Sequence, residues 1–571
     1  MAPTIACSAT AWAPCVALVT PPRVCHYLGV PRRRPDADPV FELRQHVELL
    51  EAPALRELLF EVTSELEPVA YARLVDAAAR KVVGEKGRGA LRGAGDASLL
   101  TDIEALCRTL KRRAHGDPHQ IDDLLSRLNT AWIRGEHETY CAGVTAIAEA
   151  LDGGVDLGHD ELYSEVLQTD LYEVGRRFLV SVYLTTAPSG RPEAILSAGG
   201  TLDVFEATED QPISAMEAVA LEPLPELDAF ASAWAELLRS ALTKPRLRGS
   251  WALARQLREA TLRSAGNAGL AELARASRKR EDYEAWVRAL LASGDAEGAA
   301  AAAREGAAAV AESYQQADLH ALAARIEIGR KNRGVGDLLA ALVTQPSALA
   351  LRRWLGALPK TERAGAIGAL HVVSKDNTVV ASIAALRGEW AAVASVLEPR
   401  KPLGWSESDH GGQDAIDAAV WALTRGAPST MIAQLARPRR HAVPGLDDPG
   451  AWIEEDLARE DGLPELFAPT LTELLGELGP SAPTPSEAKA LRDAISRAAL
   501  SRVSAVASSG RRSRYDDAAR VVALASLLHA DAGDAKAASE VVARARDIAG
   551  RKWTLTQAID RALGAPSKRA R

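Results

Sequence analysis

Apolar residues recur every three to four positions along almost every long segment of this chain, and this spacing places them on one face of an α-helix. Residues 42–66 contain two such stripes, separated by Pro53, which suits the first turn of a second helix. Residues 121–151 contain another pair of stripes. The apolar positions of this pair are Leu124, Leu125, Leu128, Trp132, Val144, Ile147 and Leu151. The pattern predicts helices that pair as hairpins.

A glycine followed by an acidic residue marks four predicted hairpin turns. The four steps are Gly135-Glu136, Gly294-Asp295, Gly388-Glu389 and Gly533-Asp534. Glycine is favoured just past the end of a helix because it adopts positive φ at little cost. An acidic residue next to it suits the N-terminus of the following helix, through capping or through the helix dipole. We therefore expect each step to end one helix and to begin the next.

Residues 283–307 give the clearest example of such a hairpin. The first helix carries Trp286, Leu290 and Leu291, and the facing residues of the second helix are Ala299, Ala302 and Ala303. Small side chains on one helix let it lie tightly against its partner, as in tetratricopeptide units. The four turns do not recur at the fixed period of roughly 34 residues that defines those units. The predicted fold is therefore all-α: an irregular α-solenoid, or array of tetratricopeptide-like helical hairpins.

Turn-forming stretches divide the chain into predicted parts. Such stretches lie at 81–98, 183–214 and 398–412, and two more, 437–450 and 479–489, flank a helical piece. Only residues 201–208 have the composition of a strand. The predicted parts are an irregular N-terminal segment (1–40), a helical domain with a flexible loop near 81–98 (41–182), an acidic connecting region with helices (183–250), a hairpin-repeat region (251–398), a C-terminal helical region (399–563) and a disordered basic tail (564–571).

Composition indicates a soluble protein of a reducing compartment. The chain has 571 residues, of which 47% are hydrophobic and 25% charged, as in ordinary globular proteins. An odd, sparse set of cysteines does not form a disulfide framework, which favours the cytoplasm. These cysteines are Cys7, Cys15, Cys25, Cys107 and Cys141. No run approaches the roughly 18 apolar residues of a membrane span, so we expect no membrane partner.

Charge is distributed unevenly along the chain. The net charge is −8, yet residues 151–240 alone hold 17 acidic residues against four arginines. C-terminal to this acidic part, basic residues cluster in four short stretches of three each. These are Lys244, Arg246 and Arg248; Arg278, Lys279 and Arg280; Arg437, Arg439 and Arg440; and Arg511, Arg512 and Arg514. A surface lined by these groups would attract nucleic acid, but no aromatic residues are interleaved with them.

The best candidate metal site combines His115, His119, His137 and Cys141. His137 and Cys141 are four apart and would share a helix face, whereas Pro118 favours a loop around the first pair. The same residues are also explained as surface histidines and a buried thiol, so we predict no metal and no cofactor. The chain contains no P-loop, no G-x-S-x-G and no H-E-x-x-H, and we expect no enzymatic activity.

Four stretches resemble bacterial SWIM zinc-finger proteins. These are "PCVALVT" (14–20), "FELRQHVELLEAPALRELLFEVTSELEP" (41–68), the hairpin at 286–306 and residues 514–560, which are similar to the helical region that follows the zinc module in that family. The family's metal module needs a Cys-x-Cys pair and a Cys-x-His pair. Only Cys15 stands at the matching edge, and Cys25-His26 are adjacent and cannot replace the missing ligands. The resemblance therefore implies a helical array and a scaffold role, without the family's zinc-dependent function.

Together these features predict a non-enzymatic helical-repeat scaffold that binds a protein or peptide partner in an extended groove. Two alternatives remain open. One is association with nucleic acid through the basic C-terminal half, and the other is zinc binding centred on His137 and Cys141.

Overall fold

The computed structural model describes residues 96–564, except 159–161, 206, 208, 248, 372–376, 398–411, 437–461 and 511, and it also describes Ala54 and Lys81. The predicted hairpin at 42–66, the three N-terminal cysteines and most of the loop near 81–98 lie outside these residues. So do residues 398–411, the stretch at 437–450 and the last residues of the basic tail, 565–571. The chain divides into two compact units, Met1–Ala79 and Arg80–Arg571.

The described residues form the all-α fold that the sequence predicts. They are 77% helical, with 24 α-helices and no strand. The strand expected at 201–208 is wrong, because its first three residues complete helix α9 (Arg191–Asp203). Helix α9 contacts helices on both sides of it in the chain, and this packing overrides the local strand preference. None of the described helices has the length and apolar character of a membrane span.

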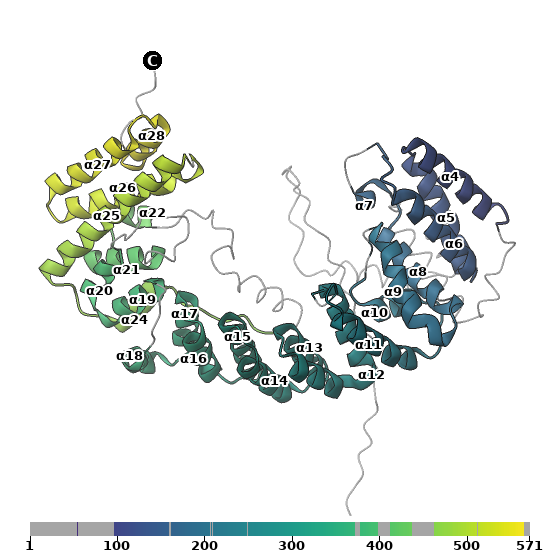
Figure 1. The fold of residues 1–571 in the computed structure, drawn as a ribbon. Helices are drawn as coiled ribbons and strands as arrows, with labels where there is room; N and C mark the ends of the chain where they lie inside the picture. The colour runs from purple at the N-terminus through teal and green to yellow at the C-terminus, as the bar shows by residue number, and fades with distance from the viewer. Residues whose placement is uncertain are drawn as a thin grey trace, which may run out of the picture. The chain divides into compact units, whose positions relative to one another are not determined.

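The first described helices form one packed group (Figure 1). They are α4 (Leu99–Arg113), α5 (Pro118–Ile133), α6 (His137–Leu151), α7 (Tyr163–Val166), α8 (Leu171–Thr185), α9 and α10 (Pro212–Val219). Helix α6 packs against α4, α5 and α8, and α8 packs against α9 and α10. Helix α8 runs continuously through residue 182, where a domain boundary is predicted.

The next helices pack mainly against their neighbours in the sequence, one after another (Figure 1). They are α11 (Leu227–Thr243), α12 (Trp251–Ser277), α13 (Arg280–Ala292), α14 (Ala296–Ala309), α15 (Ser313–Gly329), α16 (Val335–Thr344) and α17 (Ala348–Ala357). Helix α12 breaks at Gly266, where φ is 62° and ψ is −156°. We call α13 to α16 the alanine array, because α14 buries alanines at almost every inward position.

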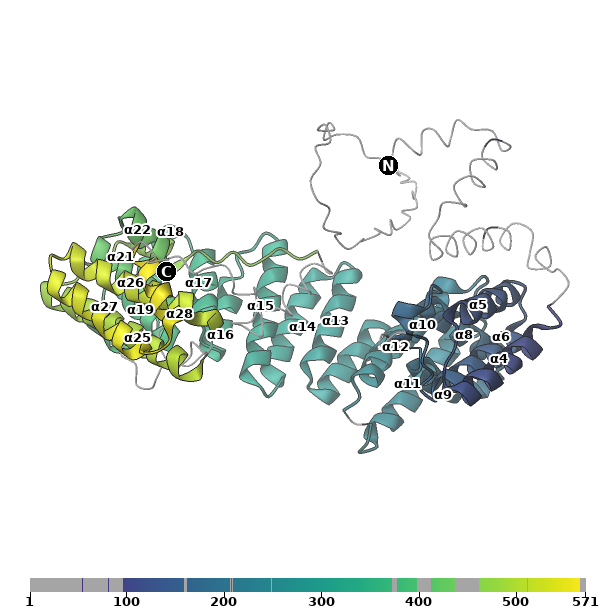
Figure 2. The same cartoon turned by 90° about the horizontal axis from the view of Figure 1, so that it is seen from above.

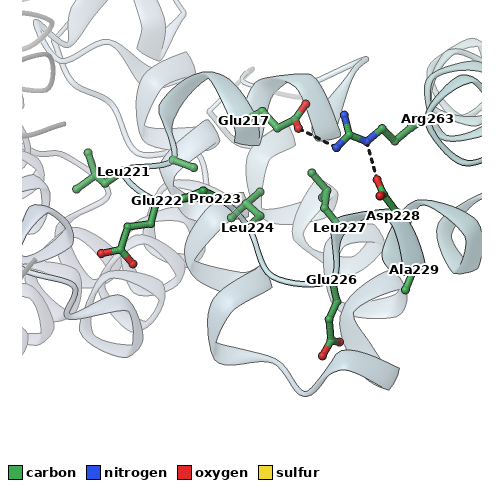
Figure 3. Close-up of a pocket in the computed structure, with 11 residues that line it drawn as sticks. Glu217, Leu221, Glu222, Pro223, Leu224, Glu226, Leu227, Asp228, Ala229 and Arg263 are labelled. Atoms are coloured by element: carbon green, nitrogen blue, oxygen red, sulfur yellow. Dashed lines mark hydrogen bonds and ion pairs between the residues drawn. The ribbon is translucent and has the colours of Figure 1, made fainter. Parts of the chain in front are cut away.

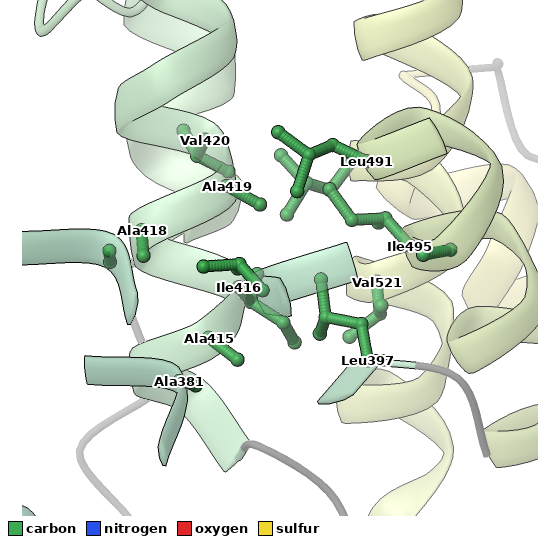
Figure 4. Packing of buried hydrophobic residues seen from close by; sticks show 14 of the residues in the cluster. Ala381, Leu397, Ala415, Ile416, Ala418, Ala419, Val420, Leu491, Ile495 and Val521 are labelled. Carbon is green, nitrogen blue, oxygen red and sulfur yellow. The ribbon is translucent and has the colours of Figure 1, made fainter. Parts of the chain in front are cut away.

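The C-terminal helices pack with long-range contacts into one large hydrophobic core. They are α18 (Lys360–Ala369), α19 (Asn377–Arg387), α20 (Trp390–Leu397), α21 (Gly412–Thr424), α22 (Thr430–Ala436), α24 (Leu471–Leu478), α25 (Pro485–Ser509), α26 (Tyr515–Asp531), α27 (Ala535–Ala549) and α28 (Trp553–Ala562). Helix α20 packs against α25, and α26 packs against α22, α27 and α28. Figure 4 shows side chains of α21 meeting those of α20, α25 and α26. We call α19 to α28 the C-terminal bundle.

The four Gly-acidic steps all lie between two helices. The φ angles of Gly135, Gly294, Gly388 and Gly533 are 85°, 82°, 74° and 78°. In each turn the glycine N–H donates to the carbonyl three residues earlier, and the next N–H donates to the carbonyl five residues earlier. This pair of bonds is the Schellman motif, which satisfies the last carbonyls of the first helix.

The acidic residues of these turns do not all cap the following helix. The carboxylates of Asp295 and Asp534 accept hydrogen bonds from the N–H groups of Gly298 and Ala537, at 2.8 and 3.0 Å. Glu136 makes no such side-chain bond. The shorter aspartate side chain therefore caps these helices, as is usual at this position.

Candidate functional site

The four candidate metal ligands lie at the starts of two helices. His115 precedes α5 and is exposed, 3.8 Å from a carboxylate oxygen of Asp156, while His119 is exposed in the first turn of α5. In α6, His137 is only 8% exposed, and its Nδ1 lies 3.1 Å from the hydroxyl of Ser181. Among the described residues, no three His, Cys, Asp or Glu side chains gather in a way that could hold a metal ion.

His137 and Cys141 have the surroundings of packed core residues rather than of metal ligands. The His137 ring meets the ring of Trp132 edge to face, with 6.3 Å between centroids, as a packed core residue does. Burial raises the pKa of the Cys141 thiol to about 11, so the sulfur stays protonated near neutral pH. Because a metal ligand must be a thiolate, this environment disfavours coordination by Cys141.

The basic stretch at the end of α12 divides between surface and interior. Arg278 and Lys279 are exposed, but Arg280 is buried and bonds Asp318 at 2.6 Å and Glu284 at 3.3 Å. Arg280 therefore does not belong to an exposed basic patch, and this part of the prediction is wrong. The physical reason is that its guanidinium ties α13 to α15.

The second predicted patch is only partly described. Arg512 and Arg514 are exposed, and Arg514 lies 3.6 Å from Asp517, whereas Arg511 is outside the described residues. Lys244 and Arg246 are exposed near the end of α11, while Arg248 and the group at 437–440 are not described.

The acidic part of the chain lines a hollow between α10, α11 and α12 (Figure 3). Its volume is about 550 Å³, and Glu217, Glu222, Glu226 and Asp228 contribute carboxylates. Arg263 of α12 bonds Glu217 at 3.3 Å and Asp228 at 3.0 Å. These two acidic residues therefore help to hold three helices together, which accounts for part of the local excess of acid.

A different site lies on α15, α16 and α17, where residues 462–470 run as an extended segment. The trace of this segment passes beside these helices in Figure 2. The guanidinium of Arg325, from α15, is 3% exposed; its Nε donates to the carbonyl of Pro464 at 3.1 Å and its Nη2 to that of Leu463 at 3.4 Å. Arginine thus binds the main chain of the segment, which any peptide sequence offers.

Five side chains of the segment are buried or half-buried. Leu463, Pro464, Leu466 and Ala468 are half-buried and Pro469 is buried, whereas Glu465 is exposed and Phe467 is 70% exposed. Leu463 packs against the core of the alanine array, and Leu466 packs against the core that continues into the C-terminal bundle. Pro464 and Pro469 favour an extended backbone, the conformation that proline-containing peptides use in grooves.

Gly356 of α17 allows the segment to approach the helix closely. A Cβ atom at this position would lie 2.8 Å from Cδ of Pro469 and 3.0 Å from the carbonyl oxygen of Phe467. Beside it, a cavity of about 340 Å³ remains, lined by helix residues such as Leu338 and Arg353 and by Leu466 and Phe467 of the segment. We call the surface around Arg325, Gly356 and this cavity the segment groove.

Sequence reasoning missed the segment groove. The piece between 450 and 479 was expected to be helical, but helix α24 begins only at Leu471, after a capping box formed by Thr470 and Glu473. The prolines at 464 and 469, with leucines three apart, were the available signal. They could not show which helices the segment contacts, because Arg325 lies 139 residues away in the chain from Pro464.

Comparisons with protein-family models, with curated proteins and with solved structures found no match to this chain.

Proposed function

We propose that this protein is a non-enzymatic scaffold that binds extended segments of partner proteins in the segment groove. The observation that carries the proposal is the seating of residues 462–470. A buried arginine pairs with two main-chain carbonyls, and Leu463 and Leu466 pack against the helix cores. A surface with these features has what a peptide-binding surface needs: main-chain bonds for affinity and shallow pockets for selectivity.

The groove also has an electrostatic and steric character that suits a peptide. Arg333 is exposed at the edge of the cavity, and Arg353 lines it. The apolar floor, which includes Leu338 and Ala357, offers contact to an aliphatic or aromatic side chain. An extended partner with apolar residues and carboxylates therefore complements it better than a nucleic acid, whose recognition would call for stacking aromatics and a larger basic surface.

Site-specific photo-crosslinking in the native cell tests the proposal. A photoreactive residue replaces Ala357 in the cavity, and a control chain carries it at Leu100, exposed on α4. We expect a crosslinked partner protein at position 357 that is absent at position 100 and is lost on Arg325→Gln. The measurement is repeated with Leu463→Ala, which loosens the chain's own segment. Crosslinks to the chain itself alone, in both backgrounds, would contradict the proposed function.

A further inference from the structure

Residues 462–470 fill the segment groove only in part. Of the segment's side chains only Pro469 is fully buried, and the large Phe467 side chain is left 70% exposed. The neighbouring cavity of about 340 Å³ stays unfilled although the segment forms part of its wall. The hollow is open to solvent, with the exposed side chains of Arg333 and Phe467 among its lining, so an apolar side chain of another segment has access to it from outside.

The main chain of the segment, unlike its side chains, makes close contacts with the groove. Arg325 is almost fully buried and donates to two carbonyls of the segment, and glycine at 356 leaves room for its backbone. The groove is therefore shaped for an extended backbone, while the side chains now in it leave contacts unused. A groove that binds the main chain firmly but leaves side-chain contacts unused can accept other segments in place of residues 462–470.

We propose that residues 462–470 are an internal pseudo-ligand that occludes the segment groove, and that the true partner is a proline-containing segment in the same extended conformation. This inference rests on the proposed function. The partner carries apolar residues at the positions of Leu463, Leu466 and Pro469, and a bulkier apolar side chain that enters the cavity beside Leu338. Filling that cavity gives the partner contacts that the internal segment lacks.

Tethering explains how a shallow segment can still keep the groove closed. A segment in the same chain competes at an effective concentration that reaches the millimolar range for short flexible links. A partner must therefore bind substantially more tightly than the isolated segment would, or the segment must be released first. Occupation by the chain's own segment thus sets a threshold for partner binding.

Fluorescence anisotropy with a labelled peptide of residues 462–470, GLPELFAPT, tests the inference on the full chain. Three proteins are compared: the wild type, the double variant Leu463→Ala/Leu466→Ala, and the same double variant with Arg325→Gln. We expect the double variant to bind the peptide at least about tenfold more tightly than the wild type, because its own segment competes less well. Adding Arg325→Gln removes bonds to the peptide main chain and should weaken binding at least about tenfold.

Two controls keep the outcome interpretable. A peptide with serine at both leucine positions should bind poorly to all three proteins, and circular dichroism should show equal helix content in all three. Equal affinity of the wild type and the double variant would overturn occlusion, while leaving the groove as a binding site. Absence of binding to every protein would overturn both the pseudo-ligand and the stated partner chemistry, and the crosslinking experiment would then decide the proposed function separately.

Discussion

The alanine array and the C-terminal bundle are both helical, but they are held together over very different distances along the chain. In the array, α14 packs against α13 and α15, its immediate neighbours. In the bundle, α20 packs against α25, and the indole N–H of Trp390 bonds the carbonyl of Ser481, 91 residues later, at 2.6 Å. Local contacts close short loops and form early, whereas long-range contacts cost more chain entropy before they stabilise anything.

The side chains at the two sets of contacts differ accordingly. The array brings α14 close through Ala299, Ala303 and Gly306, and Tyr283 fills the remaining space. A Cβ at position 306 would lie 2.6 Å from Cγ of Tyr283, so glycine is needed there. The core of the bundle also buries alanines, but larger residues such as Trp390, Leu491 and Ile495 fill much of it. The array is therefore sensitive to added volume, and the bundle to lost volume.

The largest expected effect is in the array. Ala299→Glu places a carboxylate at a position that is 0% exposed, within a cluster of buried hydrophobic residues. We expect a loss of about 4 kcal/mol or more in the free energy of unfolding, because burying an unpaired charge is among the costliest substitutions. Chemical denaturation followed by circular dichroism measures this loss.

Ala301 provides the matched control, since it lies two residues further along the same helix and is exposed. Ala301→Glu should change stability by no more than about 0.5 kcal/mol. Similar losses for the two variants would show that the alanine face is not packed as described, and the contrast with the bundle would fail.

The second effect tests the long-range character of the bundle. Trp390 is 0% exposed and stacks near Trp421, with 6.3 Å between ring centroids. Trp390→Ala should cost about 3–5 kcal/mol, the usual range for removing a large aromatic side chain from a core. Hydrogen exchange should show lost protection in α25 as well as in α20. Exchange that changes only within α19 and α20 would mean that the bundle is as local as the array.

A third, smaller effect concerns the turn that closes the array hairpin. Gly294 has φ 82°, and no atom lies within 4 Å of the place where its Cβ would be. Gly294→Val should therefore destabilise by about 1–3 kcal/mol through backbone strain alone. The midpoint of thermal unfolding reports this loss. Gly336→Val, at a helix glycine with equally open surroundings and no positive φ, tests whether strain rather than bulk is the cause.

The smallest effect is a pH dependence of the bundle. His529 of α26 is 3% exposed, and its Nε2 lies 3.0 Å from the hydroxyl of Ser496 on α25. Burial is the largest cause and lowers the pKa of His529. The nearby carboxylates of Asp493 and Asp534 raise this pKa, whereas the cations of Arg492 and Lys489 lower it further. The folded protein therefore keeps the ring neutral where the unfolded chain is already protonated.

The sign of this effect follows from proton linkage. Below the ordinary histidine pKa of about 6.5, the unfolded state binds more protons than the folded state, so stability falls as the pH decreases. Urea denaturation of the wild type at pH 7.5 and 5.5 should show this loss. In His529→Gln, which keeps a polar group near Ser496, the loss should be smaller; an unchanged loss would assign the pH dependence to other groups.

The turns of this fold were predictable because their chemistry is local. A Schellman turn needs one residue with positive φ between two helices, and glycine at 135, 294, 388 and 533 indicates such a residue in the sequence. A fifth turn of the same kind, after α15, escaped prediction because Lys331 occupies the glycine position with φ 66°. The tertiary context there imposes a conformation that lysine by itself does not favour.

Pairings between distant residues were beyond the reach of the sequence pattern. In the sequence, Arg280 is one of three clustered basic residues and is predicted to lie on the surface. In the structure, α15 places Asp318 beside it, and the two form a buried ion pair. The segment groove depends in the same way on Arg325 meeting Leu463 and Pro464. Either pairing requires the relative placement of whole helices.

The sequence by itself determined the helices, most of their ends and the small faces that let neighbours pack, since hydrophobic period, glycine and aspartate act within a few residues. Tertiary structure alone decided which distant helices meet in the bundle, which charges are buried and where residues 462–470 lie. The reason is physical: local preferences are worth fractions of a kcal/mol to about 1 kcal/mol each, whereas burial and main-chain pairing across the chain depend on the position of every packed element at once.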